Sequence, residues 1–185
     1  MDLTKIEKPF LIAQIREWIA AGECVEIALK PPAEDEAHEG IPLAISETFL
    51  SILTIKEWHA DGLKVIPLDK VASISTLPER GKILEWHGVR TTNRYFWLDL
   101  ESHTGLFQSL KKAGEFISVE DGDEFDVATV VAVAPDFVKL SAIDASGEWL
   151  DDFLDYSYKD MTVIGIDTEY ANVLGAYCRE TSPRR

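Results

Sequence analysis

The stretch FLSILTI, residues 49–55, and the stretch FVKLSAI, residues 137–143, lie 88 residues apart and share one pattern. Each starts with Phe, ends with Ile and is rich in the apolar residues of β-strands. Residues 21–27 (AGECVEI) and 113–119 (AGEFISV) also match, at an offset of 92. These correspondences predict that the chain consists of two related halves, each carrying the same order of secondary-structure elements.

The first half is predicted to form one helix followed by five strands. Apolar residues recur at helical spacing from Leu11 to Ile19, after a capping box at residues 4–7, and Gly22 ends the helix. Residues 60–62 (ADG) have the composition of a hairpin turn. The strands are expected at residues 24–30, 41–46, 49–58, 63–67 and 72–76.

The second half is predicted to repeat this order. Thr104 is the expected N-cap of its helix and Gly114 the expected stop. Its strands are expected at residues 116–120, 127–134, 137–144, 154–158 and 162–166. Between the halves, the alternation at residues 82–86 and 94–100 predicts an added hairpin or a strand-containing connector. The resulting division is a first repeat (1–80), a connector (81–103), a second repeat (104–178) and a C-terminal tail (179–185).

The composition restricts the possible partners and the location. The 185 residues include 33 Asp and Glu against 18 Lys and Arg, for a formal net charge of −15. Because Lys and Arg drive binding to phosphates, this charge makes nucleic acid and anionic membranes poor partners and favours a basic protein. No apolar run approaches the roughly 20 residues of a membrane span, and no secretory leader is present, so we expect a cytoplasmic protein without membrane contact. The two cysteines, Cys24 and Cys178, lie far apart in the sequence, so we expect no disulfide framework.

The order of one helix and five short strands is carried by residues 49–55 with 65–74, and by residues 130–143 with 156–164. These segments resemble the Sm-like family of small open barrels. The resemblance implies an α+β, mainly β fold of two helix-plus-five-strand open barrels in tandem, joined by the extra hairpin or connector. It also implies the pairing of edge strands between barrels, and therefore a possible homodimer.

The sequence offers no constellation of catalytic residues. His38, His59, His87 and His103 are scattered, and the chain has no Gly-x-Ser-x-Gly elbow, no Cys-x-x-Cys pair and no glycine-rich phosphate loop. The acidic segment 121–126 lacks a full calcium-binding loop and is interpreted as a solvated turn. We therefore expect a protein that is not an enzyme, with no catalytic residue, no metal ligand and no cofactor.

Three segments place a tryptophan beside a carboxylate near a turn: EWHADG (57–62), EWHG (85–88) and EWLD (148–151). Tryptophan with acidic neighbours is suited to binding Arg or Lys side chains of a partner, through cation-π contacts and charge complementarity. The alternative interpretation is structural, with each tryptophan covering the open end of a barrel. The candidate partner contacts are Trp58, His59, Trp86, His87, Trp149 and Asp151.

These observations favour a non-enzymatic cytoplasmic binding module with an acidic, aromatic-bearing surface for a protein partner. The first alternative is an immunity-type inhibitor of a basic toxin, because a small acidic protein can mimic the charge of nucleic acid. A small hydrolase with paired carboxylates is a second alternative. RNA binding, which the Sm-like resemblance implies, is the third, and nucleic acid is disfavoured because Asp136 lacks the nearby Asn of the RNA-binding members.

Overall fold

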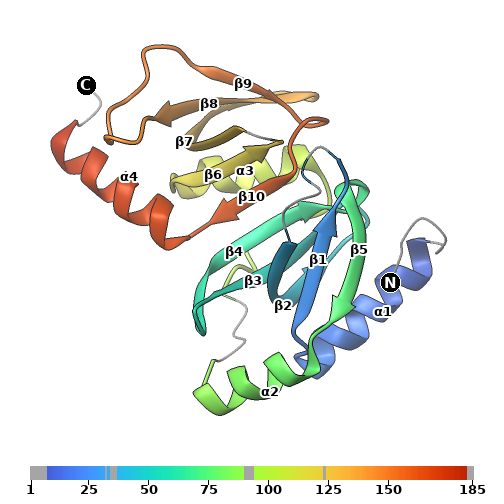
Figure 1. Cartoon of the computed structure of the whole chain (residues 1–185). Helices are drawn as coiled ribbons and strands as arrows, with labels where there is room; N and C mark the ends of the chain where they lie inside the picture. The colour runs from blue at the N-terminus through green and yellow to red at the C-terminus, as the bar shows by residue number, and fades with distance from the viewer. Residues whose placement is uncertain (1–7, 32, 34–36, 90–93, 123, 183–185) are drawn as a thin grey trace.

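The computed structural model describes residues 8–31, 33, 37–89, 94–122 and 124–182, which form four α-helices and ten β-strands (Figure 1). The first half contains α1 (Lys8–Ala21), β1 (Val25–Leu29), β2 (Ala37–Ile45), β3 (Phe49–Lys56), β4 (His59–Pro67), the 3-10 turn η2 (Leu68–Lys70), β5 (Val71–Thr76) and α2 (Pro78–His87). The second half contains α3 (His103–Ala113), β6 (Ile117–Asp121), β7 (Glu124–Val133), β8 (Phe137–Ile143), β9 (Leu154–Ser157), β10 (Val163–Ile166) and α4 (Glu169–Thr181). The predicted capping box at residues 4–7 lies outside the described residues.

All ten strands belong to one antiparallel sheet in the order β5-β1-β2-β3-β4-β10-β6-β7-β8-β9. The prediction of two separate Sm-like barrels in tandem is therefore wrong, because β4 of the first half pairs with β10 of the second and joins the halves. The two strands lie side by side at the centre of Figure 1. The broader expectation of a β-rich α+β chain agrees with the structure.

Two glycines allow this central pairing. Gly62 has φ of +73°, and a β-carbon at this position would lie 2.5 Å from the carbonyl oxygen of Ile166. Gly165 lies between Lys64 of β4 and Ser118 of β6, and a β-carbon there would collide with the Ser118 hydroxyl. Because glycine has no β-carbon, both collisions are avoided and β4, β10 and β6 can pair closely at these positions.

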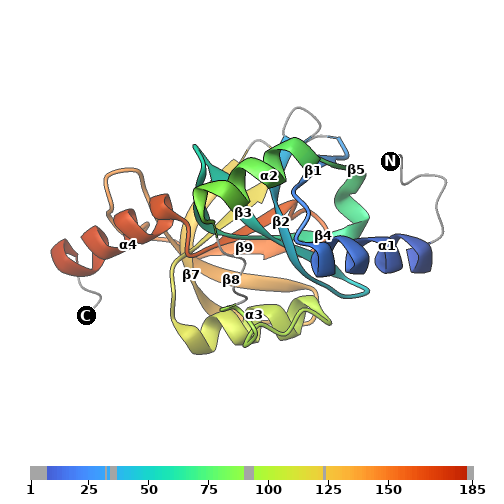
Figure 2. The same ribbon diagram turned by 90° about the horizontal axis from the view of Figure 1, so that it is seen from below.

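The apolar core also crosses the boundary between the halves. A cluster under α1 gathers its buried face, with Leu11, Ile12 and Ile15, against the first-half strands. A larger cluster lies under α3, and it combines Phe49, Leu63 and Val65 of the first half with Phe107, Leu110 and Ile164 of the second. The four helices lie outside the strands, α1 and α2 beside the first half and α3 and α4 beside the second (Figures 1 and 2).

The connector contains a helix where the sequence predicted a hairpin. Residues 82–86 belong to α2, which begins at Pro78 and ends at Gly88 with φ of +86°. Pro at the first helical position and a left-handed Gly after the last one are ordinary helix boundaries. The prediction of a strand at residues 82–86 relied on the alternation of apolar residues and was wrong. Residues 94–100 do not form a strand either.

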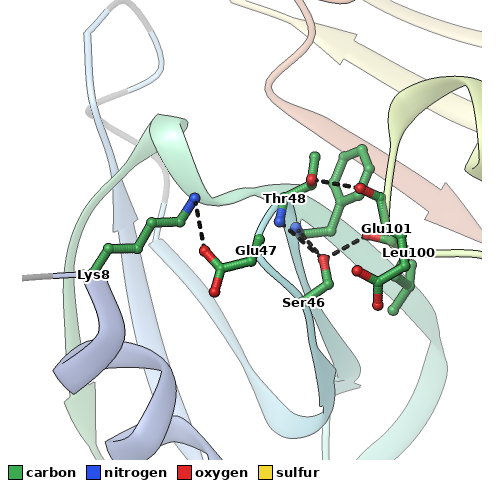
Figure 3. Close-up of polar contacts among 7 residues, drawn as sticks. Lys8, Ser46, Glu47, Thr48, Leu100 and Glu101 are labelled. Carbon is green, nitrogen blue, oxygen red and sulfur yellow. Dashed lines mark hydrogen bonds and ion pairs between the residues drawn. The ribbon is translucent and has the colours of Figure 1, made fainter.

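The segment that leads into α3 is fastened to the turn between β2 and β3 (Figure 3). The Ser46 hydroxyl accepts a hydrogen bond from the Thr48 amide at 3.0 Å and donates one to the Leu100 carbonyl at 2.5 Å. The Thr48 hydroxyl donates to the Glu101 carbonyl at 2.8 Å. These bonds hold the start of the second half on the first half.

Helix α4 has no counterpart in the prediction, which ended the second repeat at residue 178, inside the helix. Its N-cap is a local signal, because the Thr168 side chain accepts a hydrogen bond from the Ala171 amide. The first half also contributes, since Asp61 of β4 accepts from the Glu169 amide at 2.7 Å. No helix in the described part of the chain is long and apolar enough to cross a membrane.

Candidate functional site

The first EWH segment forms the tip of the β3–β4 hairpin. Lys56 pairs with His59, so Glu57 and Trp58 alone make the turn, with φ of +47° and +71°. Two-residue turns of this kind favour Asn-Gly, because both residues must adopt the left-handed conformation. Glu57 and Trp58 hold this conformation at a cost of about 1 kcal/mol each, and backbone strain of this kind is common at functional sites. The turn expected at residues 60–62 is instead part of β4.

The second EWH segment forms the last turn of α2. Leu84 faces the core and is fully buried. Trp86 follows two residues later, about 200° around the helix, and points to solvent with 85% of its surface exposed. The helix therefore presents the tryptophan outward because it anchors the leucine inward.

The structure brings these two segments together although they lie 28 residues apart in sequence. The rings of His59 and His87 meet edge to face, with centroids 5.4 Å apart and planes at 90°. Behind them, the guanidinium of Arg80 stacks on Trp58 at 4.6 Å. We call Trp58, His59, Trp86 and His87 the tryptophan–histidine surface. Four of the six predicted contact residues thus come from two segments that meet in the structure.

The other two predicted contacts lie elsewhere. Trp149 stacks on Phe116 with ring centroids 5.5 Å apart, and its indole N–H donates to the Ser182 carbonyl at 2.9 Å. The ring belongs to an apolar cluster with Ala171 and Cys178 of α4. Asp151 is exposed in the loop that follows it. Trp149 therefore has the structural role that was the alternative to partner binding. It covers apolar residues under α4, and not the open end of a barrel.

A second surface of interest is an acidic hollow of about 230 Å³ on the second half. We name it the acidic hollow and define it by its five carboxylates, Asp121, Glu124, Asp126, Asp155 and Asp160, which lie beside Tyr156. The Tyr156 hydroxyl donates to Asp126, and burial and this bond raise the pKa of the tyrosine. Burial and the neighbouring Asp160 raise the pKa of Asp121. Asp121, Glu124 and Asp126 of the segment that was predicted to be a solvated turn therefore form one wall of the acidic hollow.

Sequence reasoning missed this grouping because its members come from three separate segments. Asp126 of β7 and Tyr156 of β9 contact each other although β8 separates their strands in the sheet, and the register places Tyr156 nearest Val133 of β7, seven residues from Asp126. Only a sheet that curls brings such side chains together, and no spacing along the chain reports that curvature.

A third hollow, of about 260 Å³, lies where residues 94–97 approach α4. The Asp167 carboxylate accepts hydrogen bonds from the Tyr95 hydroxyl at 3.1 Å and the Asn172 amide at 2.7 Å, and pairs with Arg94 at 2.5 Å. Burial is the main cause of the raised pKa of Tyr95. This network satisfies its own charges, so its evident role is to hold the connector against α4.

The remaining groups of chemical interest among the described residues are possible metal ligands and the two thiols. Within the described residues, no three or more His, Cys, Asp and Glu side chains gather as a metal-ligand cluster. Cys24 and Cys178 are buried and are not joined in a disulfide. Burial raises the pKa of Cys24, which keeps it in the protonated, unreactive form at neutral pH.

The comparisons with known proteins give no relative. No family model matches the chain, and no curated protein or solved structure shows significant similarity to it. The resemblance to the Sm-like family therefore stays a prediction, and the function has to be argued from the surfaces described above.

Proposed function

We propose that this protein is a non-enzymatic cytoplasmic binding module that holds a basic protein partner on the tryptophan–histidine surface. The observation that carries the proposal is the convergence of the two EWH segments through His59 and His87, which leaves Trp86 of the second segment 85% exposed. Tryptophan side chains are the most frequent strong contributors to protein interfaces. Because Leu84 anchors α2 to the core, the backbone that carries Trp86 is already ordered before a partner binds.

The charge supports a basic partner over an acidic one. The chain carries a formal charge of −15, and the exposed carboxylates of Glu57 and Glu85 adjoin the tryptophans. A field of this sign attracts cationic proteins and accelerates their association at low salt. Binding should accordingly weaken as ionic strength rises, because salt screens exposed charges over about 10 Å at 0.1 M.

The acidic hollow supports the inhibitor as a second candidate function. Its five carboxylates lie within one concave site, which resembles the closely spaced negative charges that a nucleic-acid-binding enzyme recognises. In this case the basic partner is a toxin whose active site the hollow covers. Charge removal in the hollow, for example D155N with D160N, would then weaken inhibition more than W86A does.

A second copy of the chain is a further proposed partner. Strands β5 and β9 end the sheet, and each pairs with a single strand of its own chain. Unpaired edges of this kind are templates for pairing with another chain, which supports a homodimer. Light scattering coupled to size-exclusion chromatography tests this proposal, because a monomer mass at all accessible concentrations contradicts it.

The partner proposal is tested by affinity capture from the source cells at low salt, with W86A and F96A as matched variants. Both side chains are almost fully exposed, at 85% and 84%, but Phe96 lies outside the tryptophan–histidine surface. We expect the wild type and F96A to retain one stoichiometric basic protein that salt elutes, and W86A to lose it. Equal retention by W86A, or capture of no basic protein, contradicts the proposal.

A further inference from the structure

The separation of the two histidine rings on the tryptophan–histidine surface matches that of two imidazoles on a shared ligand. With metal–nitrogen bonds of about 2.0 Å and a tetrahedral angle, two imidazoles on one Zn²⁺ place their ring centroids about 5 Å apart. The centroids of His59 and His87 lie 5.4 Å apart. Both side chains are exposed, so their rings can rotate without disturbing the core.

The hydrogen bonding of His59 prepares one of its nitrogens for coordination. Its Nδ1 lies 2.9 Å from the carbonyl oxygen of Glu57. A carbonyl only accepts, so Nδ1 carries the proton and donates, which leaves the lone pair of the neutral ring on Nε2. Histidine ligands of metals characteristically donate their other ring N–H to a backbone carbonyl or carboxylate in this way.

The surroundings favour a cation. His87 lies in the last turn of α2, where the helix dipole is negative. The exposed residues Glu57 and Glu85 each lie two positions before one of the two histidines in sequence. The positive charge of Arg80, which stacks on Trp58, is matched by Glu39 at 2.5 Å.

We propose that His59 and His87 form a two-histidine site for a divalent transition-metal ion of the Ni²⁺, Cu²⁺ or Zn²⁺ class, which imidazole ligands suit. The protein supplies two nitrogen donors, one from the β3–β4 hairpin and one from α2, and water fills the other positions. The site goes beyond the proposed function and does not depend on it, because the metal binds whether or not the surface holds a protein.

The experiment uses the full chain without a purification tag, freed of metal by a chelator that is then removed. NiCl₂ is titrated into the wild type and into H59F, H87F and H103Q, with binding followed by calorimetry. Phe keeps an aromatic ring at each site position and removes the nitrogens. H103Q is the matched control, because it removes a histidine that contacts Phe49 and Tyr158 instead.

We expect one Ni²⁺ per chain in the wild type and H103Q, and affinity at least about tenfold weaker in H59F and in H87F. Substoichiometric Ni²⁺ should also broaden the imidazole NMR signals of His59 and His87 before those of His38 and His103. Thermal melts of each variant confirm that it is folded. The proposal is overturned if the wild type binds no Ni²⁺, if H59F and H87F bind as tightly as it does, or if all four histidine signals broaden together.

Discussion

Lys64 Nζ donates a hydrogen bond to His38 Nδ1 at 3.1 Å, and the same ammonium lies 3.2 Å from Glu120. The three side chains come from β2, β4 and β6, so the network spans both halves of the sheet. His38 is 5% exposed, and burial, with a smaller contribution from the charge of Lys64, lowers its pKa to about 4. The histidine is therefore neutral in the folded protein at physiological pH.

This relationship predicts acid sensitivity. The unfolded chain takes up a proton on His38 near pH 6.5, whereas the folded chain does so only near pH 4. The free energy of unfolding is therefore unaffected by His38 above about pH 6.5 and decreases as the pH falls from 6.5 toward 4. The loss amounts to at most about 3 kcal/mol. Urea unfolding from pH 7.5 to 4.5 should show a steeper decline in the wild type than in H38Q. Parallel declines would show that other groups cause the acid sensitivity.

The strained hairpin turn predicts a stabilising substitution. Asn tolerates the left-handed conformation that Glu57 adopts at φ of +47°, so E57N should raise the free energy of unfolding by about 0.5–1 kcal/mol. E57Q is the matched control, since it removes the same charge without the conformational preference. Chemical denaturation measures both variants, and an equal gain in E57Q would assign the effect to charge.

The central pairing of β4 with β10 predicts that G62A is strongly destabilising. The added β-carbon would lie 2.5 Å from the Ile166 carbonyl oxygen, so we expect a loss of about 2–4 kcal/mol in the free energy of unfolding. G88A is the control that separates the steric clash from the cost of a positive φ, because Gly88 has φ of +86° but no atom within 4 Å of the new carbon. G88A should lose only about 1 kcal/mol. Similar losses in both variants would mean that the close approach contributes little.

Trp149 is predicted to act on stability and not on the partner. W149F keeps the aromatic stacking on Phe116 and removes the hydrogen bond to Ser182, at a cost of about 1 kcal/mol. Partner capture should be unchanged, in contrast to W86A, whose stability should stay within about 0.5 kcal/mol of the wild type. Loss of the captured protein in W149F would return Trp149 to the binding surface.

The sequence predicts most strands because their signal is local. Residues 49–55 and 137–143 carry alternating or continuous apolar patterns, and both form strands beginning at the predicted residue. The sequence does not reveal that β4 pairs with β10, since a strand's pattern shows how it is buried and not which strand lies beside it. The helix α2 was missed for a related reason. Residues 82–86 alternate as a short strand does, and only Pro78 and Gly88 mark a helix.

The candidate site was predicted in part. The repeated EWH composition identified Trp58, His59, Trp86 and His87, but the contact between the two histidines depends on α2, which the prediction lacked. The members of the acidic hollow are separated by up to 39 residues in sequence and meet through the curvature of the sheet. The composition shows that the chain is rich in acidic residues, and only the three-dimensional structure shows that these five are neighbours.

The core under α3 has a consequence for synthesis on the ribosome. When only the first half has emerged, Phe49, Leu63 and Val65 have no α3 to cover them, and β4 still has an open edge. That edge is covered by β10, which is translated about 100 residues after β4. The first half therefore waits for β10 before its sheet is complete, and until then its exposed apolar surface is a target for chaperones.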